Sequence, residues 1–182
     1  LRDQFGRLTS LRDHKGNVVV LTFMFTNCPD VCPILTNQLH NIYEQLTEHG
    51  KEDEVSVLIV SVDPERDTVS EVWRYLDRWG FVNDWRFLVG SRDELVSIWD
   101  AYHLKPSPIL DHSTNAHSND KRDLSGEYND TTGSSSSKDD SYFVVHSAPV
   151  YLIDKHGRKR VVFTTPLEPR DVIHDIRLLL AQ

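Results

Sequence analysis

Hydrophobic runs and helical repeats alternate along the chain. Residues 18–25 form an apolar run rich in β-branched residues and phenylalanine, which predicts a buried strand. Over residues 31–50, apolar positions recur at helical spacing until a terminal glycine, which indicates a helix. Two more buried strands are predicted over residues 55–62 and 85–89.

Two further helices are marked by their first turns. Thr68 with Glu71, and Ser91 with Glu94, have the spacing of a capping box, and each pair precedes apolar residues at helical spacing. Each box therefore predicts the start of a helix.

The two ends of the chain carry turn signals. Residues 1–17 favour an N-terminal hairpin, because glycines and polar residues there separate short apolar stretches. Residues 144–153 and 160–163 predict two strands around a turn, and Pro169 fits the first turn of a closing helix.

This order of elements predicts an α/β fold. Strands that alternate with helices imply a mainly parallel sheet covered on both faces, to which the C-terminal strands add antiparallel pairs. The 182 residues suffice for one sizeable core and are few for two. We therefore expect residues 1–182 to form a single domain with a central mixed sheet flanked by helices.

A polar insertion interrupts this domain at residues 106–141. Only three residues between 111 and 141 are apolar, whereas eight are serine. Such a segment cannot bury enough surface to offset the entropy lost on ordering. We expect a long, partly mobile surface loop whose end lies near His146, where it can form a flap.

Charge and hydropathy exclude two classes of protein. The chain holds 20 Lys and Arg against 28 Asp and Glu, a net charge of −8, and it shows no basic stripe of the kind that binds nucleic acid. Its longest apolar run is far shorter than the roughly 20 residues that span a bilayer. The chain begins without Met, so we expect a mature or trimmed form.

The cysteine content points to one local site. Cys28 and Cys32 are the only cysteines, and they fall in the turn between the first long strand and its helix, which suits a thioredoxin-like fold. A helix N-terminus favours the thiolate form. At this spacing both sulfurs can bind one soft ion or meet as a disulfide, so a metal pair, a redox pair and two buried small side chains all remain open. The spacing differs from the Cys-x-x-Cys of a typical thioredoxin motif.

A third metal ligand would have to come from elsewhere in the chain. His146 is the candidate, because it begins a predicted strand directly after the polar loop, near the cysteines in such a fold. Most of the other histidines have ordinary explanations on helix surfaces, in turns or in the polar loop. The nine histidines are His14, His40, His49, His103, His112, His117, His146, His156 and His174.

Three sequence blocks occur in the order typical of one family. The first is TFMFTNCPDVCP at residues 22–33, the second VSVDPERDT at residues 60–68, and the third HS at residues 146–147 followed by VYLID at residues 150–154. Together they resemble the Sco/SenC family, the copper proteins of cytochrome c oxidase assembly.

The resemblance implies a thioredoxin fold in which Cys28, Cys32 and His146 bind one copper per chain. Soft thiolates suit Cu(I), and an added imidazole also suits Cu(II). It further implies a membrane-tethered domain outside the cytoplasm, held by an N-terminal segment absent from this chain. Its partners would be the copper-site subunit of cytochrome c oxidase, which receives the copper, and other copper chaperones or thiol reductants. We expect a monomer with no nucleic-acid partner.

Two other functions stay open. Without a standing metal, Cys28 and Cys32 would make a thiol–disulfide oxidoreductase that reduces the cysteines of the oxidase copper site, with Cys28 attacking first. A copper or redox sensor, in which loop ordering around His146 signals to a partner, is the third hypothesis. The first two can coexist, because copper loading requires reduced thiols.

Three features need separate interpretation. Val145 occupies a position where the family commonly has an acidic residue, which bears on the electrostatic tuning of His146. Pro149 is either a cis-proline opposite the cysteines or a proline at a strand start. Residues 63–67 indicate either a partner-contact loop or the start of a helix in which Arg66 pairs locally.

Overall fold

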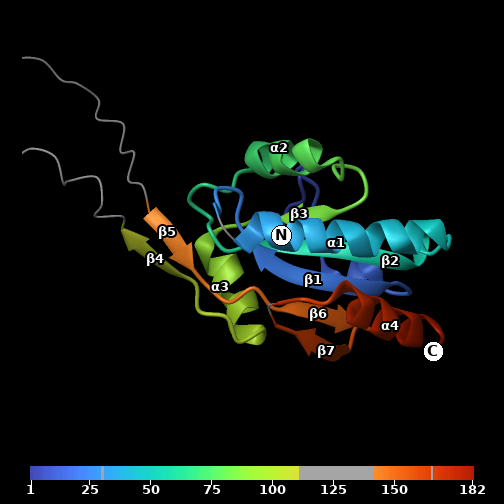
Figure 1. The fold of residues 1–182 in the computed structure, drawn as a ribbon. Coiled ribbons are helices and arrows are strands. Elements are labelled where there is room, and N and C mark those ends of the chain that lie inside the picture. The colour runs from blue at the N-terminus through green and yellow to red at the C-terminus, as the bar shows by residue number, and fades with distance from the viewer. Residues whose placement is uncertain (30, 111–141, 165) are drawn as a thin grey trace, which may run out of the picture.

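The computed structural model describes residues 1–29, 31–110, 142–164 and 166–182 (Figure 1). The helices are α1 (Val31–Glu48), α2 (Val69–Trp79), α3 (Arg92–Ala101) and α4 (Pro169–Leu180), with short 3-10 turns η1 (Leu11–His14) and η2 (Glu52–Glu54). The strands are β1 (Val18–Met24), β2 (Val55–Ser61), β3 (Arg86–Leu88), β4 (Ser107–Leu110), β5 (Tyr142–Val145), β6 (Val150–Ile153) and β7 (Lys159–Phe163).

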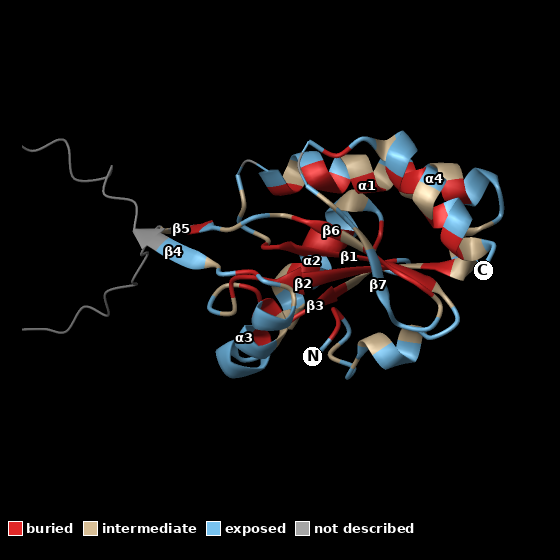
Figure 2. Cartoon of the chain, turned by 90° about the horizontal axis from the view of Figure 1, so that it is seen from below, coloured by how far each residue is buried: buried red, intermediate tan, exposed pale blue. Residues whose placement is uncertain are grey.

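A five-stranded mixed sheet forms the centre of the molecule. Its strand order is β3-β2-β1-β6-β7, with β1, β2 and β3 parallel and with antiparallel pairing of β1 to β6 and of β6 to β7. Helices α1 and α4 cover one face and α3 lies on the opposite face (Figure 2). All seven residues of β1 are buried, as its continuous apolar run predicted. The predicted α/β fold class is confirmed.

The topology brings three distant segments to one end of the sheet. Because β1 and β2 are parallel and Met24 pairs with Ser61, the turns that follow these strands leave from the same edge. Strand β6 runs the other way, so the chain just before Val150 also lies at this edge. The turn with both cysteines, the loop over residues 62–68 and the segment with His146 therefore meet.

Both predicted capping boxes mark true helix starts. The Thr68 hydroxyl accepts a hydrogen bond from the Glu71 N–H at 3.2 Å at the start of α2. At the start of α3, Ser91 and Glu94 form the reciprocal pair. These caps satisfy main-chain N–H groups that have no partner within the helix.

The structure differs from the sequence expectation in three places. The hairpin expected over residues 1–17 is limited to one antiparallel bridge between Arg2 and Leu8, because residues 11–14 form the 3-10 turn η1 instead of a strand; Arg2 also bridges Val89. The single strand expected over residues 144–153 is two strands, β5 and β6.

The break between these strands ends at Pro149, which has no N–H to continue a ladder. The predicted loop over residues 106–141 begins with strand β4, which pairs with β5 in a separate two-stranded sheet. Residues 111–141, on which the loop and flap predictions fall, lie outside the described residues.

His103 has a left-handed backbone conformation (φ 59°) directly after α3. Its N–H bonds to the Asp100 carbonyl and the Leu104 N–H bonds to the Trp99 carbonyl, a helix ending that usually carries glycine. His103→Gly is expected to stabilise the fold by about 0.5 to 1 kcal/mol, because the relieved strain exceeds the extra chain entropy of glycine. Urea unfolding measures the gain in the free energy of unfolding. His156→Gly is the control and should show no gain, because His156 lies in a turn but does not have a left-handed backbone conformation.

Candidate metal centre

The two cysteines lie at the N-terminus of α1. Cys28 lies in the turn before the helix and is half-buried, whereas Cys32 lies in its first turn and is buried. The Cys32 main-chain N–H donates to the Cys28 sulfur at 3.3 Å. Both residues are thiols, and the N–H bond together with the nearby helix N-terminus stabilises negative charge on the Cys28 sulfur.

The two thiols are not equivalent. A hydrogen bond to the Cys28 side chain, followed by burial, raises the pKa of the Cys32 thiol far above its usual range. The Cys32 thiol therefore keeps its proton, and the hydrogen bond from the Cys32 N–H favours negative charge on the Cys28 sulfur over negative charge on Cys32. Cys28 is also the sulfur that lines a surface pocket, so a metal ion or a disulfide would meet it first.

His146 lies in the irregular segment between β5 and β6. Its ring packs edge-on against Phe25, with ring centroids 5.8 Å apart, and its Nδ1 lies 2.7 Å from the Ser147 carbonyl oxygen. Burial lowers the pKa of the His146 imidazole, so the ring is neutral at neutral pH. Because a carbonyl can only accept, Nδ1 carries the proton and Nε2 keeps the lone pair that a metal needs.

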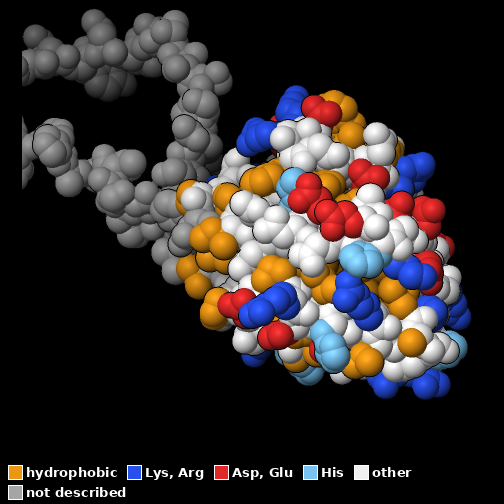
Figure 3. Space-filling view, turned by 45° about the vertical axis from the view of Figure 1, so that its right-hand side comes forward, with side chains coloured by type: hydrophobic (Ala, Val, Ile, Leu, Met, Phe, Trp, Pro, Cys, Tyr) orange, Lys and Arg blue, Asp and Glu red, His pale blue; other side chains and the backbone are white. Residues whose placement is uncertain are grey.

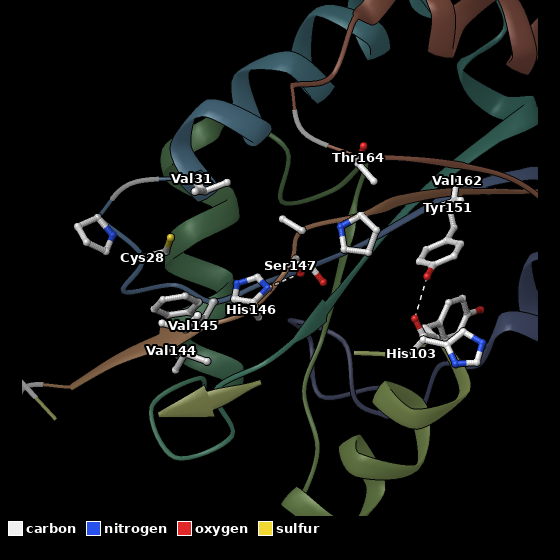
Figure 4. Close-up of a pocket in the computed structure, with 15 residues that line it drawn as sticks. Cys28, Val31, His103, Val144, Val145, His146, Ser147, Tyr151, Val162 and Thr164 are labelled. Carbon is white, nitrogen blue, oxygen red and sulfur yellow. Dashed lines mark hydrogen bonds between the residues drawn. The ribbon is translucent and has the colours of Figure 1, made fainter. Parts of the chain in front are cut away.

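Cys28 and His146 line one pocket of about 650 Å³ (Figure 4). His103 lies at its other end in this view, so the structure adds an imidazole that the sequence did not single out. Apolar side chains make most of the wall, and none of the described residues that line the pocket is Asp, Glu, Lys or Arg. Hydrophobic side chains also gather on the surface where the described chain meets the grey segment (Figure 3).

The structure brings the predicted ligands near one another without assembling a coordination shell. Cys32 lies beneath Cys28, outside the pocket lining, and across the described ranges no three His, Cys, Asp or Glu side chains are arranged to hold a metal ion. The donor types, two sulfurs and an imidazole nitrogen, nevertheless suit copper. His112 and His117 lie outside the described residues.

A buried carboxyl that the sequence did not reveal supports the cysteine turn. Asp67 accepts hydrogen bonds from the Thr26 N–H at 3.0 Å, the Thr26 hydroxyl at 2.7 Å and the Ser61 hydroxyl at 2.6 Å. Burial raises the pKa of Asp67 to about 6. The sequence placed this residue either in a partner-contact loop or at a helix start, whereas its side chain ties the second block to the first.

The comparison with protein families decides what these blocks are. The family described as SCO1/SenC matches residues 1–181, nearly the whole chain. The chain belongs to the SCO1/SenC family. All three blocks that resembled this family fall within the matched residues.

Curated relatives agree with this SCO1/SenC assignment. A SCO2-like protein of Rickettsia typhi is 25% identical over 177 residues, which cover 97% of this chain and 73% of that protein. The mitochondrial SCO2 homologue of Bos taurus is 29% identical over 157 residues, which cover 86% of this chain and 49% of that protein.

Solved structures of Sco proteins share the fold. ScoI of Bradyrhizobium japonicum, solved with copper bound, is 25% identical with a TM-score of 0.74, covering 99% of this chain and 96% of that one. Arabidopsis thaliana ScoI, also solved with copper, is 24% identical with a TM-score of 0.75, covering 98% and 95%. The fold of this SCO1/SenC chain is thus thioredoxin-like. None of the helices that the structure describes is long and apolar enough to cross a membrane.

Proposed function

We propose that this chain binds one copper ion through Cys28, Cys32 and His146 and delivers it to the dinuclear copper site of cytochrome c oxidase during assembly. The observation that carries the proposal is that Cys28 and His146, from opposite ends of the chain, line one uncharged pocket. The copper-bound ScoI of Bradyrhizobium japonicum, a relative that covers nearly the whole chain, supports it.

In this proposal each ligand has its own part. Cys28 offers the sulfur at the pocket wall, and Cys32 adds a second sulfur once the incoming ion has displaced its proton to solvent. His146 offers Nε2, with its ring orientation fixed by the Ser147 carbonyl. Copper, the cargo, would pass to the recipient by ligand exchange, in which donors of the recipient replace these groups one at a time.

His146→Ala is expected to weaken Cu(II) binding by more than about tenfold while Cu(I) affinity changes much less, because two thiolates remain for the softer ion. Competition titrations of the reduced protein with chelators of each oxidation state measure both affinities. His103→Ala, which removes the other imidazole of the pocket, is the matched control and should leave both affinities unchanged. Equal Cu(II) affinity in wild type and His146→Ala would remove His146 from the ligand set.

A thiol–disulfide oxidoreductase is the second candidate, favoured by the unequal thiols. The Cys28 thiolate would attack a disulfide of the partner, forming a mixed disulfide and releasing one partner thiolate. Cys32, once deprotonated, would then attack Cys28, forming the Cys28–Cys32 disulfide and releasing the second partner thiolate. Two electrons pass from this pair to the partner, whose two sulfurs end as thiols.

The reduction potential of the Cys28–Cys32 pair separates the two candidates. A potential of about −270 mV, together with copper-free reduction of a disulfide substrate, supports the reductase. Binding of about one copper per chain, with thiolate-to-Cu(II) charge-transfer absorption, supports the metallochaperone. BsSco, a solved structure of the same fold with a TM-score of 0.68, is a member of the Sco family of cytochrome c oxidase assembly proteins with a disulfide switch.

We also propose that the domain works at the extracytoplasmic face of a membrane, as a tethered monomer. The Bos taurus relative is mitochondrial, and a Sco relative from Bacillus anthracis is a lipoprotein. Fractionation of cells that make the full-length protein, followed by protease accessibility of this domain, tests the location.

A further inference from the structure

The segment that carries His146 is held at both of its ends. On the downstream side, the Thr22 hydroxyl of β1 donates a buried hydrogen bond to the Pro149 carbonyl at 3.0 Å. On the upstream side the segment joins β5, which has only β4 as a strand partner among the described residues. The central sheet therefore fixes the position of Pro149, and a different contact must fix β5.

Arg66 makes that contact. Its Nη1 donates to the Tyr142 carbonyl at 2.9 Å, and its guanidinium carbon lies 3.7 Å from the centroid of the Tyr142 ring. The Tyr142 hydroxyl donates to Asp63 at 2.5 Å, and Asp63 in turn forms a short ion pair with Arg66. Asp63 is almost fully buried, so the three side chains make one interlocked cluster between the second block and the first residue of β5.

The same guanidinium also lies near the ring that supports His146. Its central carbon is 5.8 Å from the centroid of Phe25, and Phe25 packs edge-on against His146. A purely local ion pair at the start of a helix, which is one of the two interpretations that the sequence left open, would need only Arg66 and an acidic neighbour such as Asp63. The bond to a main-chain carbonyl of β5 and the ring contacts go beyond that role, since they join elements far apart in the chain.

We infer that Arg66 is a positioning residue for the metal centre: through Tyr142 it holds β5 so that the His146 imidazole stays against Phe25 and beside the Cys28 pocket. The inference rests on the proposed function, because it concerns the geometry of a proposed ligand. Arginine suits this task better than lysine, because its planar fork can bind Asp63 and the Tyr142 carbonyl at the same time.

The test compares Arg66→Met and Arg66→Lys with wild type. Loss of an outer partner of a ligand costs roughly 10- to 100-fold in metal affinity, so Arg66→Met should weaken Cu(II) binding by that factor. Arg66→Lys should fall between Arg66→Met and wild type. Cu(I) affinity should stay within about threefold for both, because two thiolates dominate it. The coupling of imidazole nitrogen to Cu(II) in electron paramagnetic resonance should weaken or become heterogeneous.

Arg92→Met is the matched control. Arg92 binds the exposed Glu65 of the same loop at 2.6 and 3.0 Å and does not touch β5 in the described structure, so its loss should leave both affinities and the nitrogen coupling unchanged. If Arg66→Met leaves Asp63 too costly to bury, the double variant Asp63→Asn with Arg66→Met removes both charges and still lacks the Arg66 bond to the Tyr142 carbonyl.

The outcomes separate this inference from the proposed function. If His146→Ala weakens Cu(II) binding but the folded Arg66 variants keep wild-type affinity and nitrogen coupling, Arg66 is structural only and the inference is overturned. If His146→Ala itself leaves Cu(II) binding unchanged, His146 is not a ligand, and both the proposed ligand set and the role inferred for Arg66 are overturned. A parallel loss of Cu(I) and Cu(II) affinity in Arg66→Met would also overturn the inference, because it would show general damage to the site.

Discussion

Cys28→Ser is expected to abolish the charge-transfer band from the Cys28 thiolate to Cu(II). It should also lower Cu(I) affinity by more than roughly 10- to 100-fold, the cost of losing a residue that only hydrogen-bonds to a metal ligand. The reason is the unequal pair: Cys28 lines the pocket and accepts the Cys32 N–H, whereas Cys32 holds its proton in the core. A serine hydroxyl at this position is a hard, neutral donor that soft Cu(I) binds poorly. Anaerobic chelator competition and absorption spectra of the loaded protein measure the change.

The companion variant Cys32→Ser tests the order of the two thiols. Both variants should lose Cu(I) affinity, but only Cys32→Ser should still attack a disulfide, because Cys28 remains at the surface of the pocket. It should therefore accumulate a mixed disulfide that mass spectrometry detects. A trapped adduct on Cys28→Ser instead, or Cu(I) affinity of Cys28→Ser within tenfold of wild type, would contradict the assigned roles.

The second large effect concerns Asp67 and the pH dependence of folding. Burial raises the pKa of Asp67 from 3.8 to about 6, so between about pH 4 and pH 6 the folded state binds more protons than the unfolded state. The stability that the protonated carboxyl contributes is present below about pH 4 and is lost as pH rises through 6. A shift of about two pKa units corresponds to about 3 kcal/mol.

Asp67→Asn is expected to remove this dependence. An asparagine oxygen can still accept from Thr26, and its NH₂ group can donate to the Ser61 hydroxyl, so the network survives without a titrating group. The variant should match wild type near pH 4 and exceed its free energy of unfolding by up to about 3 kcal/mol at pH 7.

Urea unfolding at both pH values measures this difference. Asp77→Asn, which changes an exposed carboxylate on α2, is the control and should shift neither value. If the free energy of unfolding differs between Asp67→Asn and wild type by the same amount at both pH values, the pKa of Asp67 does not change between the folded and unfolded states.

Much of the site could be predicted from the sequence because local pattern and topology suffice for it. The cysteines follow a strand and precede a helix, and parallel strands put their carboxyl ends at one edge, so the turn at Cys28 and the loop at Asp63 had to be neighbours. The position of His146 directly after the polar loop made it the candidate among nine histidines, and the family resemblance then implied that it is a ligand. The placement of the cysteine turn, the Asp63 loop and His146 depends on the order and spacing of residues along the chain, which can be read from the sequence.

The contacts that set the position of His146 could not be predicted in the same way. The bonds from Arg66 and Asp63 to Tyr142 join segments separated by the whole polar insertion, and nothing local in the sequence marks Tyr142 as their partner. The burial of the Asp67 side chain likewise depends on tertiary contacts. From the local sequence alone, an acidic residue before a helix fits an exposed first turn equally well. The sequence allowed a strand start at Pro149, but the valines at 144–145 and the apolar residues from 150 onward favoured one continuous strand.

The small ladder of β4 and β5 gives the chain a natural place for a graft. Leu110 and Tyr142 are register partners, so the two ends of the intervening sequence emerge side by side, whatever its length. Lengthening a loop whose ends are already held costs only about 0.6 kcal/mol per doubling. A fluorescent reporter inserted between these residues would be attached to β5, the strand that leads to His146. Because β4 and β5 form a separate sheet, the insertion would not interrupt a strand of the central sheet.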